Sequence, residues 1–369
     1  MKIISNSMTL VVLFLVTGFA LHAQTSSANT TTKEKSSLRL FKADHRYIQY
    51  TGRIDFSNPA LPRFWLPGVY IKAKFRGSIC EIILNDEELY GNNHNYVEII
   101  IDNKKPFRIQ AAGKTNTIKA AGGLNNGEHT ITICKNTEPG IGYLEFVGLR
   151  CKELLPADNK PLRKIEFIGN SITCGTGSDL SKIPCDSGQW YDQHNAYLSY
   201  GPVTARSLKA QWHLTSVSGI GLIHSCCNMT VTMPQIFDKV NLRTNSIKWN
   251  FKNYEPQAVT ICLGQNDGVQ DSVKFSRAYI HFLKDVRKRY PNADIVCLSS
   301  PMADASLITI MKNYLTGIVN YMNEKGDNKV SKYFFSKQYN HGCGGHPDLA
   351  QHKKIAEELT KYISRLKGW

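Results

Sequence analysis

The chain has 369 residues, of which 42% are hydrophobic and 20% charged, and its formal net charge is +15. This length exceeds what one ordinary hydrophobic core encloses, so we expect two domains. The positive charge forms no dense Lys/Arg run and accompanies no nucleic-acid-binding motif. We therefore expect no nucleic-acid partner and interpret the charge as a general surface bias.

Residues 1–23 have the pattern of a secretory signal peptide. Lys2 supplies the positive charge, an apolar run extends from Met8 to Ala20, and a small residue, Ala23, ends the segment. The run is too short for a membrane span, so no span is expected once the signal is removed; a retained N-terminal anchor is the alternative. Residues 24–38 are rich in Thr, Ser and Lys and read as a linker. We expect export to the periplasm, the cell surface or the medium.

Residues 39–155 read as short strands separated by Gly, Asn and Asp clusters, with almost no helical period. This spacing predicts an all-β sandwich or jelly roll. The aromatic segment around Trp65 suits either a sugar platform or the core, and we expect the core. The expected strands are Tyr47–Tyr50, Val69–Phe75, Ile79–Leu84, Tyr96–Ile101, Thr117–Ala120, His129–Cys134 and Tyr143–Leu149.

Residues 160–369 change to alternating strands and helices, which predicts an α/β domain with a parallel sheet covered by helices on both faces. The expected strands are Ile165–Gly169, Trp212–Val217, Ala258–Leu263, Ile295–Ser299 and Tyr333–Phe335. The expected helices are Asn195–Lys209, Phe275–Arg289, Ser306–Asn323 and a last one that opens at His346-Pro347, with Pro347 in its first turn.

Polar residues follow three of these strands at the edge where ligands of open parallel sheets bind. Ser171, Gly221 and Asn266 lie at strand ends, and His346 lies at the start of the last helix. Serine becomes a nucleophile when a base such as histidine removes its proton. The backbone N–H groups of Ser171 and Gly221 and the Asn266 amide would form a three-donor oxyanion hole, with Gly219 as the alternate to Gly221. The pattern indicates acyl transfer.

These residues resemble the conserved blocks of the SGNH (GDSL-type) hydrolase superfamily. The blocks correspond to Gly169-Asn170-Ser171, the Ser218-to-Gly221 segment, Gly264-Gln265-Asn266-Asp267 and His346-Pro347. The wider layout is similar to carbohydrate esterase family 2, which joins an N-terminal jelly roll to a flavodoxin-like SGNH domain. The resemblance implies an exported serine esterase that removes acetyl groups from plant polysaccharides such as xylan and glucomannan. The alternatives are a carbohydrate-binding surface protein with a decayed site and an SGNH lipase or thioesterase.

One departure concerns the group that orients His346. The superfamily usually has an Asp two or three residues before this His, whereas here Cys343 and Gly344 occupy those positions. Some members of the esterase family look like Ser-His dyads in which a backbone carbonyl holds the imidazole. A carbonyl of Cys343, Gly344 or Gly345 could do this; a carboxylate from elsewhere and a crippled enzyme are the alternatives. Asp348 is expected to cap the helix instead.

Trp190 and Tyr191, between the first two blocks, are candidates for stacking on a sugar ring, with buried packing as the alternative. Asp267 is expected to hold its turn together and His352 to pack within the last helix. Among ten cysteines, Cys174 and Cys185 are the expected disulfide pair. No His/Cys cluster has zinc spacing, so we expect neither metal nor cofactor. The sequence leaves the oligomeric state open.

Overall fold

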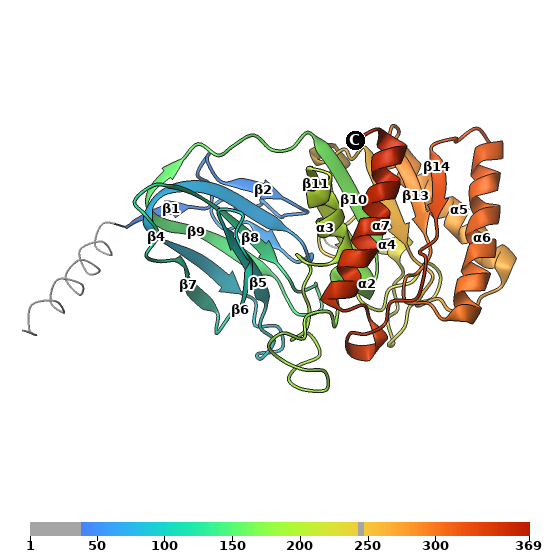
Figure 1. Ribbon diagram of the computed structural model, residues 1–369, viewed down its shortest axis with the longest axis horizontal. Coiled ribbons are helices and arrows are strands. Elements are labelled where there is room, and N and C mark those ends of the chain that lie inside the picture. The colour runs from blue at the N-terminus through green and yellow to red at the C-terminus, as the bar shows by residue number, and fades with distance from the viewer. Residues whose placement is uncertain (1–37, 243–246) are drawn as a thin grey trace, which may run out of the picture. The chain divides into compact units, whose positions relative to one another are not determined.

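A computed structural model describes residues 38–242 and 247–369 (Figure 1). The predicted signal peptide, residues 1–23, and nearly all of the predicted linker, residues 24–38, lie outside the described residues. None of the helices in the described ranges combines the length and hydrophobicity that a bilayer crossing requires.

The first half of the described chain is an antiparallel sheet, as predicted. Its hydrogen-bonded order is β1-β9-β4-β8-β5-β6, with β2 and β7 paired to β4 and β3 paired to β9. The strands are β1 (Arg39–Lys42), β2 (Gln49–Thr51), β3 (Arg63–Phe64), β4 (Tyr70–Asp86), β5 (Tyr96–Ile101), β6 (Phe107–Gln110), β7 (Thr115–Ala121), β8 (Glu128–Lys135) and β9 (Leu144–Leu155). The short strands β1, β3 and β6 were not predicted, since two to four residues carry little periodicity.

The long strand β4 joins two segments that were predicted as separate strands. The chain passes through Gly77, at a φ of 123°, without leaving the sheet. The pairing of β4 with β9 shifts register between Arg76 and Cys80, which marks a bulge rather than a turn. Gly77 therefore marks a bulge within one strand, and the prediction of two separate strands was wrong.

Alternation along the sandwich strands places apolar side chains in a shared core. In β7 and β8, buried and exposed or half-buried positions alternate over most of the strand, as a sheet with one covered face requires. Trp65 is 4% exposed, which confirms the core assignment over the sugar platform.

The second half contains a five-stranded parallel sheet, which confirms the predicted flavodoxin-like class. The order β11-β10-β12-β13-β14 is the 2-1-3-4-5 arrangement, so the strand order reverses beside β10. The strands are β10 (Arg163–Gly169), β11 (Ala210–Ser216), β12 (Ala258–Cys262), β13 (Asp294–Leu298) and β14 (Val330–Tyr333). The helices are α2 (Ser171–Cys174), α3 (Tyr200–Ser207), α4 (Met233–Ile236), α5 (Ser272–Arg289), α6 (Ala305–Glu324) and α7 (Leu349–Lys367), with 3-10 turns η1 (Phe251–Asn253) and η2 (Cys343–Gly345).

Successive residues of these strands face two different helix layers. Ile168 joins the apolar cluster that contains α5 and α6 residues, while its neighbour Phe167 joins the cluster of α3 and α7 residues. Side chains alternate between the two faces of the sheet, and helices cover both faces. Each strand is therefore a continuous run of apolar residues in the sequence. The C-terminal strand ends are left for loops, and the candidate site lies there.

Two helices begin later than predicted. Residues 195–199 do not join α3, because the Asn195 side chain accepts the Leu198 N–H and Ser199 Oγ donates to the Ala196 carbonyl. The last helix begins after Asp348, which caps it through the Gln351 N–H. The cap confirms the role expected of Asp348. Pro347 precedes the cap and is not in the first turn, so that part of the prediction was wrong.

A buried ion pair joins the sandwich to the parallel sheet. Arg53, from the segment between β2 and β3, contacts Glu166 of β10 at 2.9 Å, with both side chains fully buried. Glu166 also accepts hydrogen bonds from Thr215 and Tyr290. The apolar cluster on the α5/α6 side of the sheet likewise includes sandwich residues, so the two halves share a core.

Candidate active site

Ser171 is the first residue of a single helical turn that follows β10. Asn170 caps this turn by accepting the Ile172 N–H. A Cβ at Gly169 would lie 2.1 Å from the Thr173 hydroxyl, so the tight turn needs glycine there. The Ser171 N–H has no acceptor among the described residues. It lies at the start of the helical turn, where backbone N–H groups have no acceptor within the helix.

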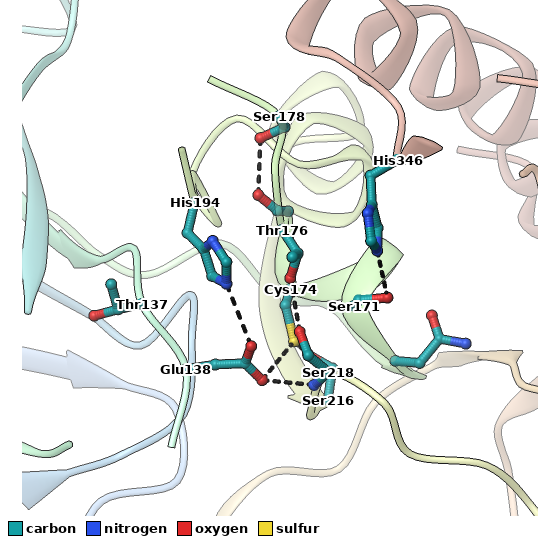
Figure 2. A network of polar contacts seen from close by, with 12 residues as sticks. Thr137, Glu138, Ser171, Cys174, Thr176, Ser178, His194, Ser216, Ser218 and His346 are labelled. Carbon is teal, nitrogen blue, oxygen red and sulfur yellow. Dashed lines mark hydrogen bonds and ion pairs between the residues drawn. The ribbon is translucent and has the colours of Figure 1, made fainter. Parts of the chain in front are cut away.

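His346 lies beside Ser171 although 175 positions separate them. The distance from His346 Nε2 to Ser171 Oγ is 2.8 Å (Figure 2). On the other side of the ring, His346 Nδ1 is 3.0 Å from the Cys343 carbonyl oxygen. A carbonyl accepts only, so Nδ1 carries the proton and Nε2 presents its lone pair to the serine hydroxyl. This tautomer is the one a general base requires.

Burial lowers the pKa of His346 and outweighs the opposing hydrogen bond to the Cys343 carbonyl. The imidazole is therefore neutral at neutral pH and able to take a proton. The carbonyl in contact with Nδ1 belongs to the residue that stands where the superfamily usually has Asp. Gly344 and Gly345, at φ values of 60° and 70°, let the chain fold back to make this contact.

Cys343 forms a disulfide with Cys185, which lies in the loop after the nucleophile turn. The expected Cys174–Cys185 pair was wrong. Cys174 belongs to the turn that Ser171 begins, and its buried thiol contacts the Ser216 hydroxyl at 3.3 Å. The prediction relied on the short separation of Cys174 and Cys185 along the sequence. In the structure, the loop that carries Cys185 instead meets the segment before His346. A second disulfide joins the neighbours Cys226 and Cys227.

The two candidate glycine N–H groups differ in whether another group already accepts their hydrogen bond. The Gly221 N–H donates to Ser225 Oγ at 3.0 Å and is engaged within its own loop. The Gly219 N–H has no acceptor in the part of the chain that is described. The geometry therefore favours the alternate, Gly219. The Asn266 side chain donates to the Ile220 carbonyl at 2.8 Å, which leaves its second amide proton for a ligand.

Asp267 ties the second block to the third. Its carboxylate accepts the backbone N–H groups of Leu222, Ile223 and His224 at 2.7 to 3.0 Å. Asp267 thus has a structural role, as expected, but its carboxylate holds the 222–224 segment rather than its own turn. His352 is fully buried and accepts the Tyr200 N–H, which confirms its packing role.

The two aromatic candidates separate. Trp190 is 53% exposed, and its ring meets the His194 ring edge-on at 4.9 Å. Tyr191 is 1% exposed, and its hydroxyl accepts the His94 N–H. Buried packing therefore describes Tyr191, and of the two rings only Trp190 is exposed.

One buried pair beside the site was missed by the sequence analysis. Glu138, from the loop between β8 and β9, contacts His194 Nε2 at 3.3 Å (Figure 2). No motif marks Glu138, and it lies in the half of the chain that carries none of the SGNH blocks. Among the described residues, no group of three or more His, Cys, Asp or Glu side chains is placed to hold a metal ion.

Two family profiles match the two halves of the chain. A profile described as carbohydrate esterase 2 N-terminal matches residues 50–157, and one described as GDSL-like lipase/acylhydrolase family matches residues 167–329. A solved family two carbohydrate esterase from Clostridium thermocellum, in complex with cellohexaose, is 32% identical. Its TM-score is 0.80, and the alignment covers 87% of this chain and 99% of that one. The chain belongs to carbohydrate esterase family 2.

Two curated relatives extend this family 2 assignment. Cellulase/esterase CelE of Acetivibrio thermocellus is 34% identical over 343 residues, which cover 88% of this chain. The match spans only 40% of the length of CelE. An acetylxylan esterase/glucomannan deacetylase of Cellvibrio japonicus is 28% identical, with 93% of this chain and 96% of the relative covered.

Proposed function

We propose that this family 2 chain is an exported carbohydrate O-acetylesterase that removes acetyl groups from plant polysaccharide of the xylan or glucomannan type. The observation that carries the proposal is the 2.8 Å contact between Ser171 Oγ and His346 Nε2, with Nδ1 held by a backbone carbonyl. The name of the Cellvibrio japonicus relative supports the substrate class. Export rests on the signal pattern of residues 1–23.

In the proposed reaction, His346 Nε2 takes the proton of Ser171 as Oγ attacks the acetyl carbonyl carbon. The resulting oxyanion accepts hydrogen bonds from the N–H groups of Ser171 and Gly219 and from the Asn266 amide. The intermediate collapses as the imidazolium gives its proton to the departing sugar oxygen. Water, deprotonated by the same imidazole, then attacks the acetyl-serine carbonyl carbon. The second intermediate collapses as the imidazolium returns the proton to Ser171 Oγ, and acetate is released. Every step uses side chains and backbone groups of this chain.

The proposed organisation assigns residues 39–155 to the sandwich domain and residues 160–369 to the catalytic domain. We assign the sugar contact to Trp190, because a flat exposed ring suits the apolar face of a pyranose. The neighbouring His194 ring holds Trp190 edge-on, so the indole is presented in a defined orientation.

The test is acetate release from acetylated xylan and acetylated glucomannan by the wild type and Ser171→Ala, with p-nitrophenyl acetate as a second substrate. We expect the wild type to release acetate and Ser171→Ala to fall by at least about 10³-fold. Equal rates for the two proteins would refute the esterase proposal and leave the carbohydrate-binding alternative. Faster hydrolysis of p-nitrophenyl octanoate than of the acetate would indicate a lipase or thioesterase instead.

A further inference from the structure

Glu138 is a fully buried carboxylate that the sandwich half contributes to the candidate active site. It is 1% exposed and lies between β8 and β9, yet both of its oxygens contact residues of the α/β half (Figure 2). One oxygen accepts the Ser218 N–H at 2.5 Å, and the other contacts His194 Nε2 at 3.3 Å. The Cys174 thiol lies 3.7 Å from the same oxygen as Ser218.

The loop that carries Glu138 is held firmly by the sandwich. The buried ammonium of Lys135 donates to the Thr137 carbonyl at 2.7 Å and to the Glu138 carbonyl at 3.5 Å. The Thr137 hydroxyl donates to the Asn95 side chain at 2.6 Å. These bonds fix the Thr137 side chain and the backbone of Thr137 and Glu138, so the sandwich determines where the carboxylate lies.

Ser218 is the residue just before Gly219, the favoured oxyanion donor. Its N–H is held by Glu138, and its hydroxyl lies 2.7 Å from the Thr176 hydroxyl. Thr176 in turn donates its N–H to the Ser171 carbonyl at 3.1 Å. Ser218 is thus fastened between Glu138 and the nucleophile turn. Rotation of the Ser218 backbone would change the direction of the Gly219 N–H, because this group belongs to the next peptide.

We propose that Glu138 is a positioning residue for acyl transfer, which holds Ser218 so that the Gly219 N–H faces the oxyanion next to Ser171. This inference rests on the proposed esterase function. Through it, the sandwich becomes part of the catalytic arrangement even though it touches none of the reacting atoms. The same carboxylate contacts Nε2 of the His194 ring, whose Nδ1 has no hydrogen-bond partner among the described residues, and so also supports Trp190.

The protonation state of Glu138 suits this role. Burial opposes ionisation, but the hydrogen bonds from His194 and Ser218 outweigh it and lower the pKa of Glu138. The carboxylate is therefore an anion at neutral pH and acts only as an acceptor. A charge-assisted bond to a backbone N–H is about twice as strong as a neutral one, which suits a contact that must hold one peptide in place.

The variants separate the acceptor from the charge. Glu138→Ala removes the acceptor, whereas Glu138→Gln keeps a carbonyl oxygen that can accept the Ser218 N–H. The matched controls are Glu98→Ala and Glu98→Gln. Glu98 is another buried sandwich carboxylate, and it contacts Asn195, the neighbour of His194, at 3.1 Å without touching Ser218. Thermal unfolding is measured for every variant, together with kcat and KM for p-nitrophenyl acetate.

We expect Glu138→Ala to lower kcat by about 10²-fold with KM within about threefold, because the Gly219 N–H is no longer held toward the oxyanion. Glu138→Gln should stay within about tenfold of the wild type, and both Glu98 variants within about threefold, at comparable unfolding temperatures. If Glu138→Ala does not fold, Glu138→Asp replaces it, since the shorter side chain withdraws the carboxylate from Ser218 by one methylene; kcat should then fall further than in Glu138→Gln.

Two results would overturn the inference. One is a folded Glu138→Ala with the kcat of Glu98→Ala, which would make the contact structural only. The other is a Glu138→Gln as slow as Glu138→Ala, which would mean that the acceptor is not what matters. The wild type and Ser171→Ala are measured in parallel. If these two were equal the proposed function itself would fail, whereas an active wild type with an unaffected Glu138→Ala would reject the role of Glu138 alone.

Discussion

The Cys185–Cys343 disulfide anchors the carbonyl that holds His346, so breaking it should slow catalysis. The perturbation is Cys185→Ser, which removes the cross-link and leaves the Cys343 backbone in place. Besides the disulfide, the Cys343 N–H bond to the Gly177 carbonyl at 2.8 Å also fixes the segment. The carbonyl therefore loosens without being released.

The expected size of the effect follows from two limits. Deleting the orienting carboxylate of an established triad costs about 10⁴ in turnover, which is an upper limit for full release of the imidazole. A misplacement of about 1 Å costs about 10²-fold. Because the bond to Gly177 remains, we expect kcat to fall by about 10- to 100-fold. The bridge also closes a loop of 158 residues, for which chain entropy gives a stabilisation of at most about 5 kcal/mol.

The assay is p-nitrophenyl acetate hydrolysis well below the unfolding temperature, with and without a phosphine reductant. The reductant should slow the wild type and leave Cys185→Ser unchanged. Cys185→Ser/Cys343→Ser controls for mispairing of the freed thiol, and Cys226→Ser/Cys227→Ser controls for the second disulfide. A folded Cys185→Ser with kcat within about twofold of the wild type would show that the other contacts suffice to hold the carbonyl.

Three further predictions concern the proposed oxyanion hole, the base and the contact between the halves. Asn266→Ala should lower kcat by about 10²–10³-fold with little change in KM, since one donor is lost in the transition state. The acidic limb of kcat/KM should have an apparent pKa below the ordinary histidine value of about 6.5, because burial lowers the pKa of His346 and the base works when neutral. Glu166→Ala should lower the free energy of unfolding by about 3–5 kcal/mol, since it leaves Arg53 buried and unpaired.

Each of these has its own control. For Asn266→Ala, an increase in KM with unchanged kcat would assign the amide to substrate binding. The pH profile is recorded with two substrates of different leaving group, and an acidic limb above pH 7 in both would contradict a buried neutral base. For Glu166→Ala, urea unfolding is compared with Glu145→Ala, whose ion pair with Arg63 is partly exposed and should contribute about 1 kcal/mol or less.

Much of the site could be predicted because its residues occupy positions that the fold defines from local sequence. Ser171 and Asn266 each follow an apolar run, and the ends of parallel strands meet at one edge of a sheet. His346 opens the segment before a strongly amphipathic helix, which brings it to the same edge. In these cases the local sequence pattern and the overall architecture agree, so the positions of these residues could be predicted from the sequence alone.

The remaining features depend on contacts that no local pattern encodes. The Cys185–Cys343 pair forms because two loops meet in space, and sequence separation gave the wrong partner for Cys185. The choice between Gly219 and Gly221 depends on whether a nearby Ser225 hydroxyl has already taken one N–H. Glu138 comes from the other half of the chain, in a turn between two strands. Nothing in the local sequence distinguishes it there from any other polar turn residue.

The replacement of the usual Asp by a carbonyl changes how the proposed mechanism distributes its electrostatics. A carboxylate both orients the imidazole and stabilises the imidazolium, whereas the Cys343 carbonyl orients it and carries only a partial negative charge. The nearby His194 lowers the pKa of His346 and the buried Glu138 raises it, so the two groups act on the ring in opposite directions. Stabilisation of the transition state then falls mainly on the oxyanion donors. The inferred role of Glu138 lies there, in holding one of those donors in position rather than in assisting the base.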